Sequence, residues 1–184
     1  MSVESKVTAQ NALAMLKEGN KKFLTAKNPI GDISPQIRLK TAKEGQFPYA
    51  VIVTCADSRV IPESIFSVGI GEIFVIRVAG FVVNQTQLGS IEYAVDHLGS
   101  PLVVVLGHTQ CGAVGTALHH HEVDGALKVI IDEISAVIGD EKNPEEAVKL
   151  NVKNSCKVIE DDKISAKVVG AVYHIDSGEV EFLD

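Results

Sequence analysis

The chain has 184 residues, of which 46% are hydrophobic, and its formal net charge is −7 at pH 7. A chain of this length can bury one good core, so we expect residues 1–184 to form a single domain. The charge is acidic and no block of like charge occurs, which argues against nucleic acid or an anionic membrane surface as a partner. A small-molecule substrate fits this balance better.

The N-terminus and the cysteines indicate in which cellular compartment the protein is expected. The stretch "MSVESKVTAQN" lacks the apolar core of a signal peptide, and no segment approaches the ~18 uncharged apolar residues that span a bilayer. Three cysteines at irregular spacing do not suggest a disulfide framework. We therefore expect a cytoplasmic protein with reduced thiols.

The first 45 residues have the pattern of two helices. Residues 8–27 show the spacing of an amphipathic helix. Its apolar stripe consists of Leu13, Leu16, Phe23 and Leu24. A second helix is expected after Ser34 as N-cap, with Pro35 at its first position and Gly45 just past its end. Residues 1–45 are thus predicted to form an N-terminal helical arm.

The character of the sequence changes after this arm. Three short runs of mostly β-branched residues follow, "AVIVT" (50–54), "IFVIRV" (73–78) and "PLVVVLG" (101–107). Nearly continuous apolar runs are typical of strands that are covered on both faces. The segment "QLGSIEYAVDHL" (87–98) between the second and third runs has helical spacing. Alternation of strands and helices predicts right-handed βαβ units and a parallel sheet.

The last third of the chain predicts more helices and a closing hairpin. Residues 143–162 have a helical pattern, and "AKVVGAVYHI" and "GEVEFL" are joined by the turn residues "DSG". The predicted fold is α/β. It has a mostly parallel central sheet of four strands, an antiparallel edge strand and helices on both faces, with residues 46–184 as the core behind the arm.

Three metal-ligating side chains follow two of the predicted strands. Cys55 comes directly after residues 50–54, and His108 and Cys111 come directly after residues 101–107. Because ligands of open parallel sheets bind outside the carboxyl ends of the strands, these side chains are expected to meet at one edge. Two thiolates and one imidazole suit Zn²⁺. The sequence therefore predicts one zinc ion per chain.

The residues after Cys55 suggest what the metal does. Three protein ligands with a fourth position open is the arrangement of catalytic zinc. Asp57 is near enough in sequence to bind the metal or to accept a hydrogen bond from its water, and Arg59 can hold the Asp57 carboxylate away through a bidentate pair. We expect a zinc-bound hydroxide as nucleophile. Its activity should rise into the alkaline range, because two thiolates cancel the charge of zinc.

At this point the residues also resemble a known family. The stretches "CADSR" (55–59) and "GHTQCG" (107–112) are similar to the zinc signature of the β-class carbonic anhydrases. The similarity extends to "ALAMLKEGNKKF", "IFVIRVAG", "SIEYAVDHLG" and "GAVYHIDSGEVEF". The resemblance implies a carbonate dehydratase that hydrates carbon dioxide reversibly to bicarbonate and a proton. It implies Cys55, His108 and Cys111 as zinc ligands and Asp57 with Arg59 as the catalytic dyad.

The resemblance also implies a substrate pocket and an assembly. Gln46 matches a glutamine that hydrogen-bonds substrate in the plant-like branch of the family, and this match favours an open metal site. The backbone N–H of Gly112 matches a second substrate contact, and Phe74 and Tyr93 match aromatic residues of the pocket wall. Members of the family form homodimers or dimer-based tetramers with the active site near the subunit interface.

Three alternatives stay open at the level of sequence. Carbonyl sulfide and carbon disulfide hydrolases share the zinc signature, and Phe81 stands where many carbonic anhydrases have asparagine, which makes this stretch more apolar. A non-catalytic structural zinc domain would bind the metal with four protein ligands. A thiol redox protein could use Cys55 and Cys111, but the chain has no C-x-x-C motif.

Overall fold

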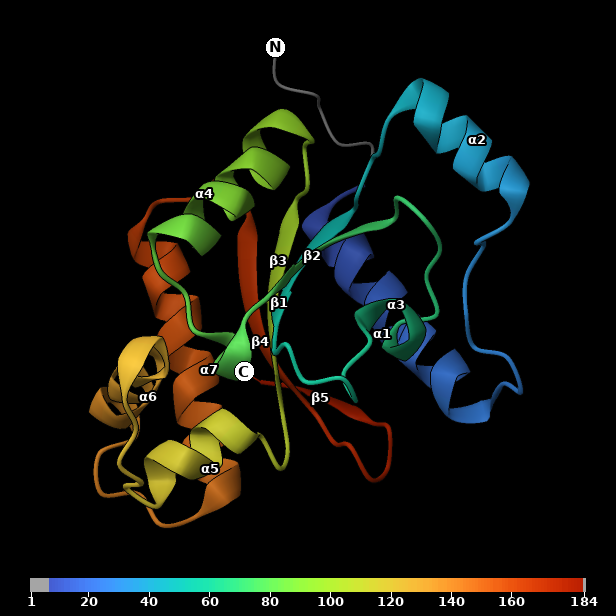
Figure 1. The fold of residues 1–184 in the computed structure, drawn as a ribbon. Coiled ribbons are helices and arrows are strands. Elements are labelled where there is room, and N and C mark those ends of the chain that lie inside the picture. The colour runs from blue at the N-terminus through green and yellow to red at the C-terminus, as the bar shows by residue number, and fades with distance from the viewer. Residues whose placement is uncertain (1–6, 184) are drawn as a thin grey trace.

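The computed structural model describes residues 7–183, which fold around one five-stranded sheet (Figure 1). The strands are β1 (Ala50–Thr54), β2 (Ile73–Arg77), β3 (Leu102–His108), β4 (Lys167–Tyr173) and β5 (Val180–Phe182). Their order is β2-β1-β3-β4-β5; the first four are parallel, and β5 runs antiparallel to β4. The predicted fold class is confirmed, including the antiparallel edge strand.

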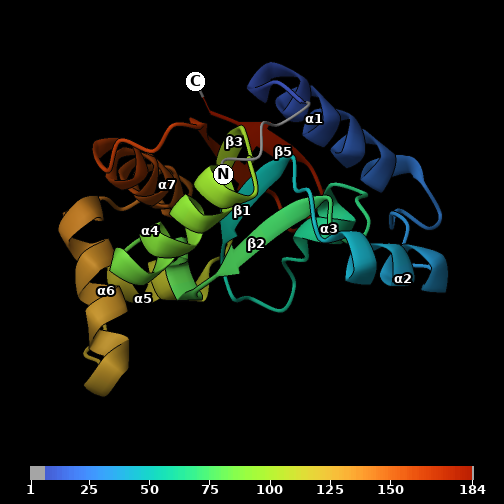
Figure 2. The ribbon, with the colours of Figure 1, turned by 90° about the horizontal axis from the view of Figure 1, so that it is seen from above.

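Helices cover both faces of the sheet. They are α1 (Ala9–Thr25), α2 (Pro35–Glu44), α3 (Pro62–Ile65), α4 (Gln85–Glu92), α5 (Gly112–Leu118), α6 (Gly125–Ile138) and α7 (Pro144–Asp161). Figures 1 and 2 show α1, α2 and α3 on one side of the sheet and α4 to α7 on the other. No helix among residues 7–183 is long and apolar enough to cross a membrane.

The alternating side chains of the strands contribute to two hydrophobic cores, one on each face of the sheet. Val51 and Val53 of β1 pack with the helices α4 to α7, whereas Ala50 and Ile52 pack with α1 and α3. All five residues of β1 are buried. Burial on both faces is the reason why the strand sequences are continuously apolar instead of alternating.

Both helices of the predicted arm are present, although one residue of the predicted apolar stripe is exposed. The Ser34 hydroxyl accepts the N–H of Ile37, Pro35 is the first residue of α2, and Gly45 follows its end with a φ of +87°. In α1, Leu16 is fully buried, but Leu24 is 42% exposed. Leu24 lies near the C-terminal end of α1 and lines an open hollow beside β5, so periodicity alone overestimated the width of the buried stripe.

The register places the site. β1 lies between β2 and β3, and Thr54 is level with Arg77 of β2 and Leu106 of β3. His108 pairs with Tyr173 at the end of β4. Because these four strands are parallel, their carboxyl ends lie at one edge of the sheet. His108 is the last residue of β3. The strand therefore ends one position later than the run 101–107 predicted.

Candidate metal centre

The three predicted metal ligands lie together at this edge. Cys55 follows β1, His108 ends β3, and Cys111 immediately precedes α5. The two sulfur atoms and an imidazole nitrogen all lie within 4.8 Å of one another, and all three residues are buried. The parallel register thus brings together residues that are 53 positions apart in the chain, as 108 − 55 = 53.

His108 is prepared to bind a metal through Nε2. Its Nδ1 lies 2.9 Å from the carbonyl oxygen of Thr109, so that Nδ1–H donates there and Nε2 keeps its lone pair. Nε2 is buried and has no hydrogen-bond partner among residues 7–183. A buried polar atom without a partner is costly. A zinc ion bound to Nε2 removes that cost, so the residues present fit the metal.

The sulfur atoms are surrounded by donors. The Cys111 thiol donates a hydrogen bond to the sulfur of Cys55. This bond is the largest cause of two shifts: it lowers the pKa of Cys55 to about 4 and raises the pKa of Cys111. The backbone N–H groups of Asp57 and Gly80 also donate to Cys55. Cys111 receives the N–H groups of two residues in the first turn of α5, Ala113 and Val114. Such donors stabilise thiolate, which is the form that binds zinc.

Asp57 is held by Arg59 in a bidentate pair. Nε of Arg59 donates to Oδ1 of Asp57 at 3.0 Å, and Nη2 donates to Oδ2 at 2.8 Å. The backbone N–H of Arg59 also donates to Oδ1. These bonds, first of all that from the guanidinium, hold the pKa of Asp57 well below its usual range. Oδ2 lies 3.9 Å from Nε2 of His108, so the carboxylate is beside the metal ligands.

Arg77 is a residue of this site that the sequence did not single out. At the end of β2, its Nε donates to the carbonyl oxygen of Cys55 at 3.2 Å and its Nη2 to that of Asp57 at 2.7 Å. Arg77 therefore fixes the backbone of the loop that carries a metal ligand and the dyad. The sequence feature that could have indicated this role is a single cationic residue at the end of an apolar strand, level with Thr54.

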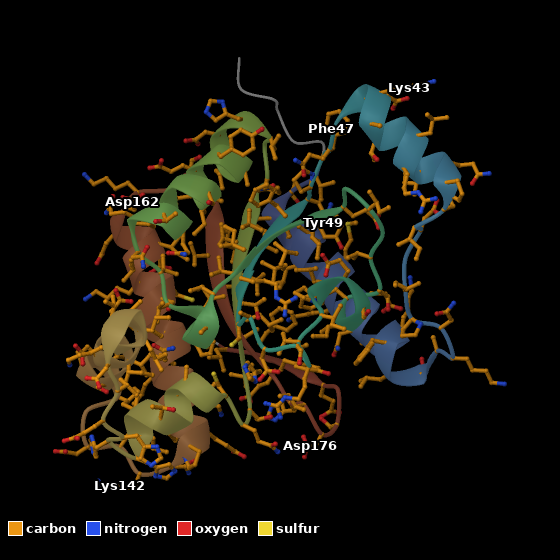
Figure 3. All side chains as sticks on the ribbon, in the orientation of Figure 1. Lys43, Phe47, Tyr49, Lys142, Asp162 and Asp176 are labelled. Atoms are coloured by element: carbon orange, nitrogen blue, oxygen red, sulfur yellow. The ribbon has the colours of Figure 1, made fainter. Side chains whose placement is uncertain are left out.

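Three other predicted site residues lie elsewhere within this chain. Gln46 precedes the start of β1 and Phe74 is the second residue of β2, whereas the metal ligands follow the strand ends. Tyr93 packs on Phe74, with 6.2 Å between ring centroids. Five residues of strand separate the two ends of β1 by about 15 Å. In Figure 3, Phe47 marks one end of the sheet and Asp176, just past β4, marks the other.

The residues at the far end form a surface of their own. A hollow of about 380 Å³ is lined by Gln46, Phe47, Tyr93 and His97, among others. Phe47 is 63% exposed and Tyr93 is 49% exposed, which is high for aromatic side chains. Gly112, by contrast, is the first residue of α5 and follows the ligand Cys111 directly. Within one chain, the predicted pocket wall therefore lies apart from the metal ligands.

The comparison with known proteins agrees with this site. The carbonic anhydrase family matches residues 50–180. Carbonic anhydrase 2 of Mycobacterium tuberculosis is 37% identical over 190 residues, which cover 92% of this chain and 90% of that protein. A solved tetrameric β-carbonic anhydrase of Sordaria macrospora has 26% identity and a TM-score of 0.72, covering 82% of this chain and 87% of that one.

A carbon disulfide hydrolase shares the fold alone. Its apo structure has a TM-score of 0.57 at 15% identity and covers 79% of this chain and 86% of the hydrolase. This chain belongs to the carbonic anhydrase family. It is a β-class member with the zinc site Cys55, His108 and Cys111, and its reaction is the hydration of carbon dioxide.

Proposed function

We propose that this carbonic anhydrase works with the fourth position of its zinc open, and that Arg59 keeps it open by holding Asp57. The bidentate pair between Arg59 and Asp57 carries this proposal. Both carboxylate oxygens of Asp57 accept from the guanidinium, and these bonds compete with binding of the carboxylate to the metal. A third bond, from Nη2 of Arg59 to the carbonyl oxygen of Gln110, ties the guanidinium to the loop before Cys111.

The chemistry divides between the metal and the chain. Zinc, when bound, would act as a Lewis acid that lowers the pKa of water and so supplies a nucleophile. Asp57, ionised and fixed in direction, accepts a hydrogen bond from the attacking water and orients it toward the carbon of the substrate. The N–H of Gly112, in the first turn of α5, donates to the oxygen on which negative charge develops. Arg77 keeps the loop from Cys55 to Asp57 in place.

The remaining substrate contacts come from a second copy of the chain. Gln46, Phe74 and Tyr93 cannot reach the metal of their own chain across the length of β1, and they lie beside exposed aromatic surface. In a two-fold dimer each chain gives its metal to one site and its Gln46 end to the other. We therefore propose a homodimer, alone or within a tetramer, with the active site at the subunit interface. Gln46 also supports placement in the plant-like branch.

A mixing experiment tests this arrangement. Cys55→Ala removes a metal ligand, and Gln46→Ala removes the substrate contact; each variant alone should hydrate carbon dioxide poorly. If the halves come from different chains, a refolded equimolar mixture should recover about one quarter of the wild-type rate, since half the dimers are mixed and each has one intact site. A mixture no more active than its components contradicts the shared site, and it leaves the metal assignment standing.

The substrate is tested beside it. Stopped-flow hydration of carbon dioxide with a pH indicator should be fast, and release of hydrogen sulfide from carbonyl sulfide by the same sample should be slow. Fast hydrolysis of carbonyl sulfide with slow hydration of carbon dioxide would instead indicate a carbonyl sulfide hydrolase. We further propose a cytoplasmic location, because Cys55 and Cys111 must stay reduced to bind zinc. Residues 1–184 form one domain in this proposal, since both cores lie on the same sheet.

A further inference from the structure

Two polar side chains are buried in the apolar face of α7. Asn151 and Ser155 are each only 2% exposed, and they lie on the face that also buries Val148, Val152 and Ile159. Burial of an amide or a hydroxyl is unfavourable unless it is hydrogen-bonded. Neither residue caps a helix end, since α7 runs from Pro144 to Asp161. Their partners therefore show what they do.

Both side chains donate to the same turn between β2 and α4. Nδ2 of Asn151 donates to the carbonyl oxygen of Gly80 at 2.8 Å, and Oγ of Ser155 donates to that of Phe81 at 3.1 Å. Gly80 has a φ of +68° and Phe81 a φ of +45°. The second value is unfavourable for a residue with a Cβ. Two bonds from α7 thus hold a turn whose backbone conformation is not favoured by itself.

This turn is part of the wall of the metal centre. The N–H of Gly80 donates to the sulfur of Cys55. A Cβ at position 80 would lie 2.6 Å from Ile134 and 3.2 Å from Ala113, so the turn is packed against α5 and α6. The Phe81 ring is fully buried and lies under Gly107, the residue before His108. The turn accordingly contacts the elements that carry all three metal ligands.

We propose that Asn151 and Ser155 are positioning residues for the metal centre, which fix the Gly80–Phe81 turn so that its N–H points at the sulfur of Cys55. They touch neither substrate nor metal, and they act through the backbone of the turn. Hydrogen bonds of this kind around a metal orient the ligand and tune its basicity. The inference depends on the zinc site but not on the roles proposed for Asp57, Arg59 and Gln46.

The chain offers matched controls for two variants. Asn151→Leu is compared with Asn20→Leu, because Asn20 is also buried and also donates to backbone carbonyl oxygens, those of Ile65 and Gly178, which lie outside the Gly80–Phe81 turn. Ser155→Ala is compared with Ser100→Ala, because Ser100 is 1% exposed and its Oγ donates to the carbonyl oxygen of Pro48. Each serine variant loses one buried bond, whereas Asn20→Leu loses three and Asn151→Leu one, so the asparagine control is the more severe change. Only the α7 member of each pair touches the turn.

The readouts are metal affinity and spectroscopy. Zinc affinity is measured by competition with a chromogenic chelator, and the sulfur-to-metal charge-transfer band is recorded with Co²⁺ in place of zinc. Asn151→Leu should bind zinc about tenfold or more weakly and shift the Co²⁺ band, since outer partners of metal ligands have effects of about 10- to 100-fold. Ser155→Ala should change both in the same direction and less. The controls should lose thermal stability, yet keep their zinc affinity within about twofold.

Two outcomes overturn the proposal. One is that both α7 variants bind zinc as tightly as the wild type with an unchanged Co²⁺ band. The other is that Asn20→Leu and Ser100→Ala weaken zinc as much as their counterparts, which would mean that general loss of stability explains the effect. If Asn151→Leu does not fold, Ser155→Ala decides alone against Ser100→Ala, because it removes only one oxygen atom.

Discussion

The role of Arg59 can be tested by removing its side chain. Arg59→Ala deletes both guanidinium bonds to Asp57 and the bond to the carbonyl oxygen of Gln110. One anchor remains, because the backbone N–H of residue 59 still donates to Oδ1 of Asp57. Oδ2 is already within 3.9 Å of Nε2 of His108, so a small rotation about the Asp57 side chain brings it to the metal ligands. We expect the freed carboxylate to occupy the fourth position and block the site.

The size of the effect follows from the bonds that are lost. Hydrogen bonds to a charged group contribute about 1.5–3 kcal/mol each. The Arg59 side chain is 46% exposed, so water screens the pair and its bonds contribute less than this range. Loss of an exposed ion pair shifts an equilibrium by about fivefold at most, here toward the closed form. The turnover number follows the open fraction, so it should fall by at most about fivefold.

The assay is stopped-flow hydration of carbon dioxide, with Arg38→Ala on the exposed helix α2 as control. Co²⁺-substituted Arg59→Ala should show a changed d–d spectrum, because a carboxylate replaces water as a ligand. Arg59→Lys, which keeps the charge but not the planar fork, should be intermediate. Full activity together with an unchanged spectrum in Arg59→Ala would show that Arg59 does not hold the site open.

Three further predictions concern the neighbourhood of the site and the outer sheet. Arg77→Met should lower the hydration rate about tenfold, as two bonds to the Cys55–Asp57 backbone are lost, while circular dichroism stays unchanged; a normal rate would remove Arg77 from the site. Burial raises the pKa of Cys156 to about 12, so this thiol should react with a disulfide reagent at pH 8 only after denaturation, which peptide mapping can follow. Lys149, followed by His174, lowers the pKa of Glu181 below 4.5. The stability that this pair contributes is present above pH 4.5 and is lost as acid protonates Glu181, so Glu181→Gln should destabilise at pH 7 by under about 1 kcal/mol and by less at pH 3; an equal loss at both values would contradict the linkage.

The sequence was sufficient for the fold because local signals agreed with one another. The apolar runs predicted β1, β2 and β3 to within a residue or two, and the cap at Ser34 with the glycine at position 45 located α2. The segment 87–98 was less well predicted. Its helix gives way at Tyr93 to a π-helical turn through His97, where the hydrogen-bond pattern changes while the apolar spacing continues. Periodicity alone does not report such a change.

The metal ligands could be predicted because topology is nearly forced once parallel strands are recognised. The residues that support them could not. Arg77 acts on carbonyl oxygens, and Asn151 and Ser155 act on a turn, so their partners are backbone atoms that leave no trace in the pattern of side chains. What the sequence did contain was two polar residues inside the apolar stripe of α7. A buried polar residue at such a position is a signal for a partner, although not for its identity.

Chain direction also explains why the predicted pocket residues and the metal stand apart. A residue just before a parallel strand and a residue just after it lie at opposite edges of the sheet, whatever function they share. Gln46 and Cys55 flank β1 in this way, so no side-chain rotation within one chain brings them together. Within one chain the metal ligands follow the strands, whereas the exposed Phe47 and Tyr93 lie at the opposite end of the sheet. The proposed two-fold pairing would bring the Gln46 end of one chain to the metal ligands of the other, so that dimer formation would complete the site and bury Phe47 and Tyr93.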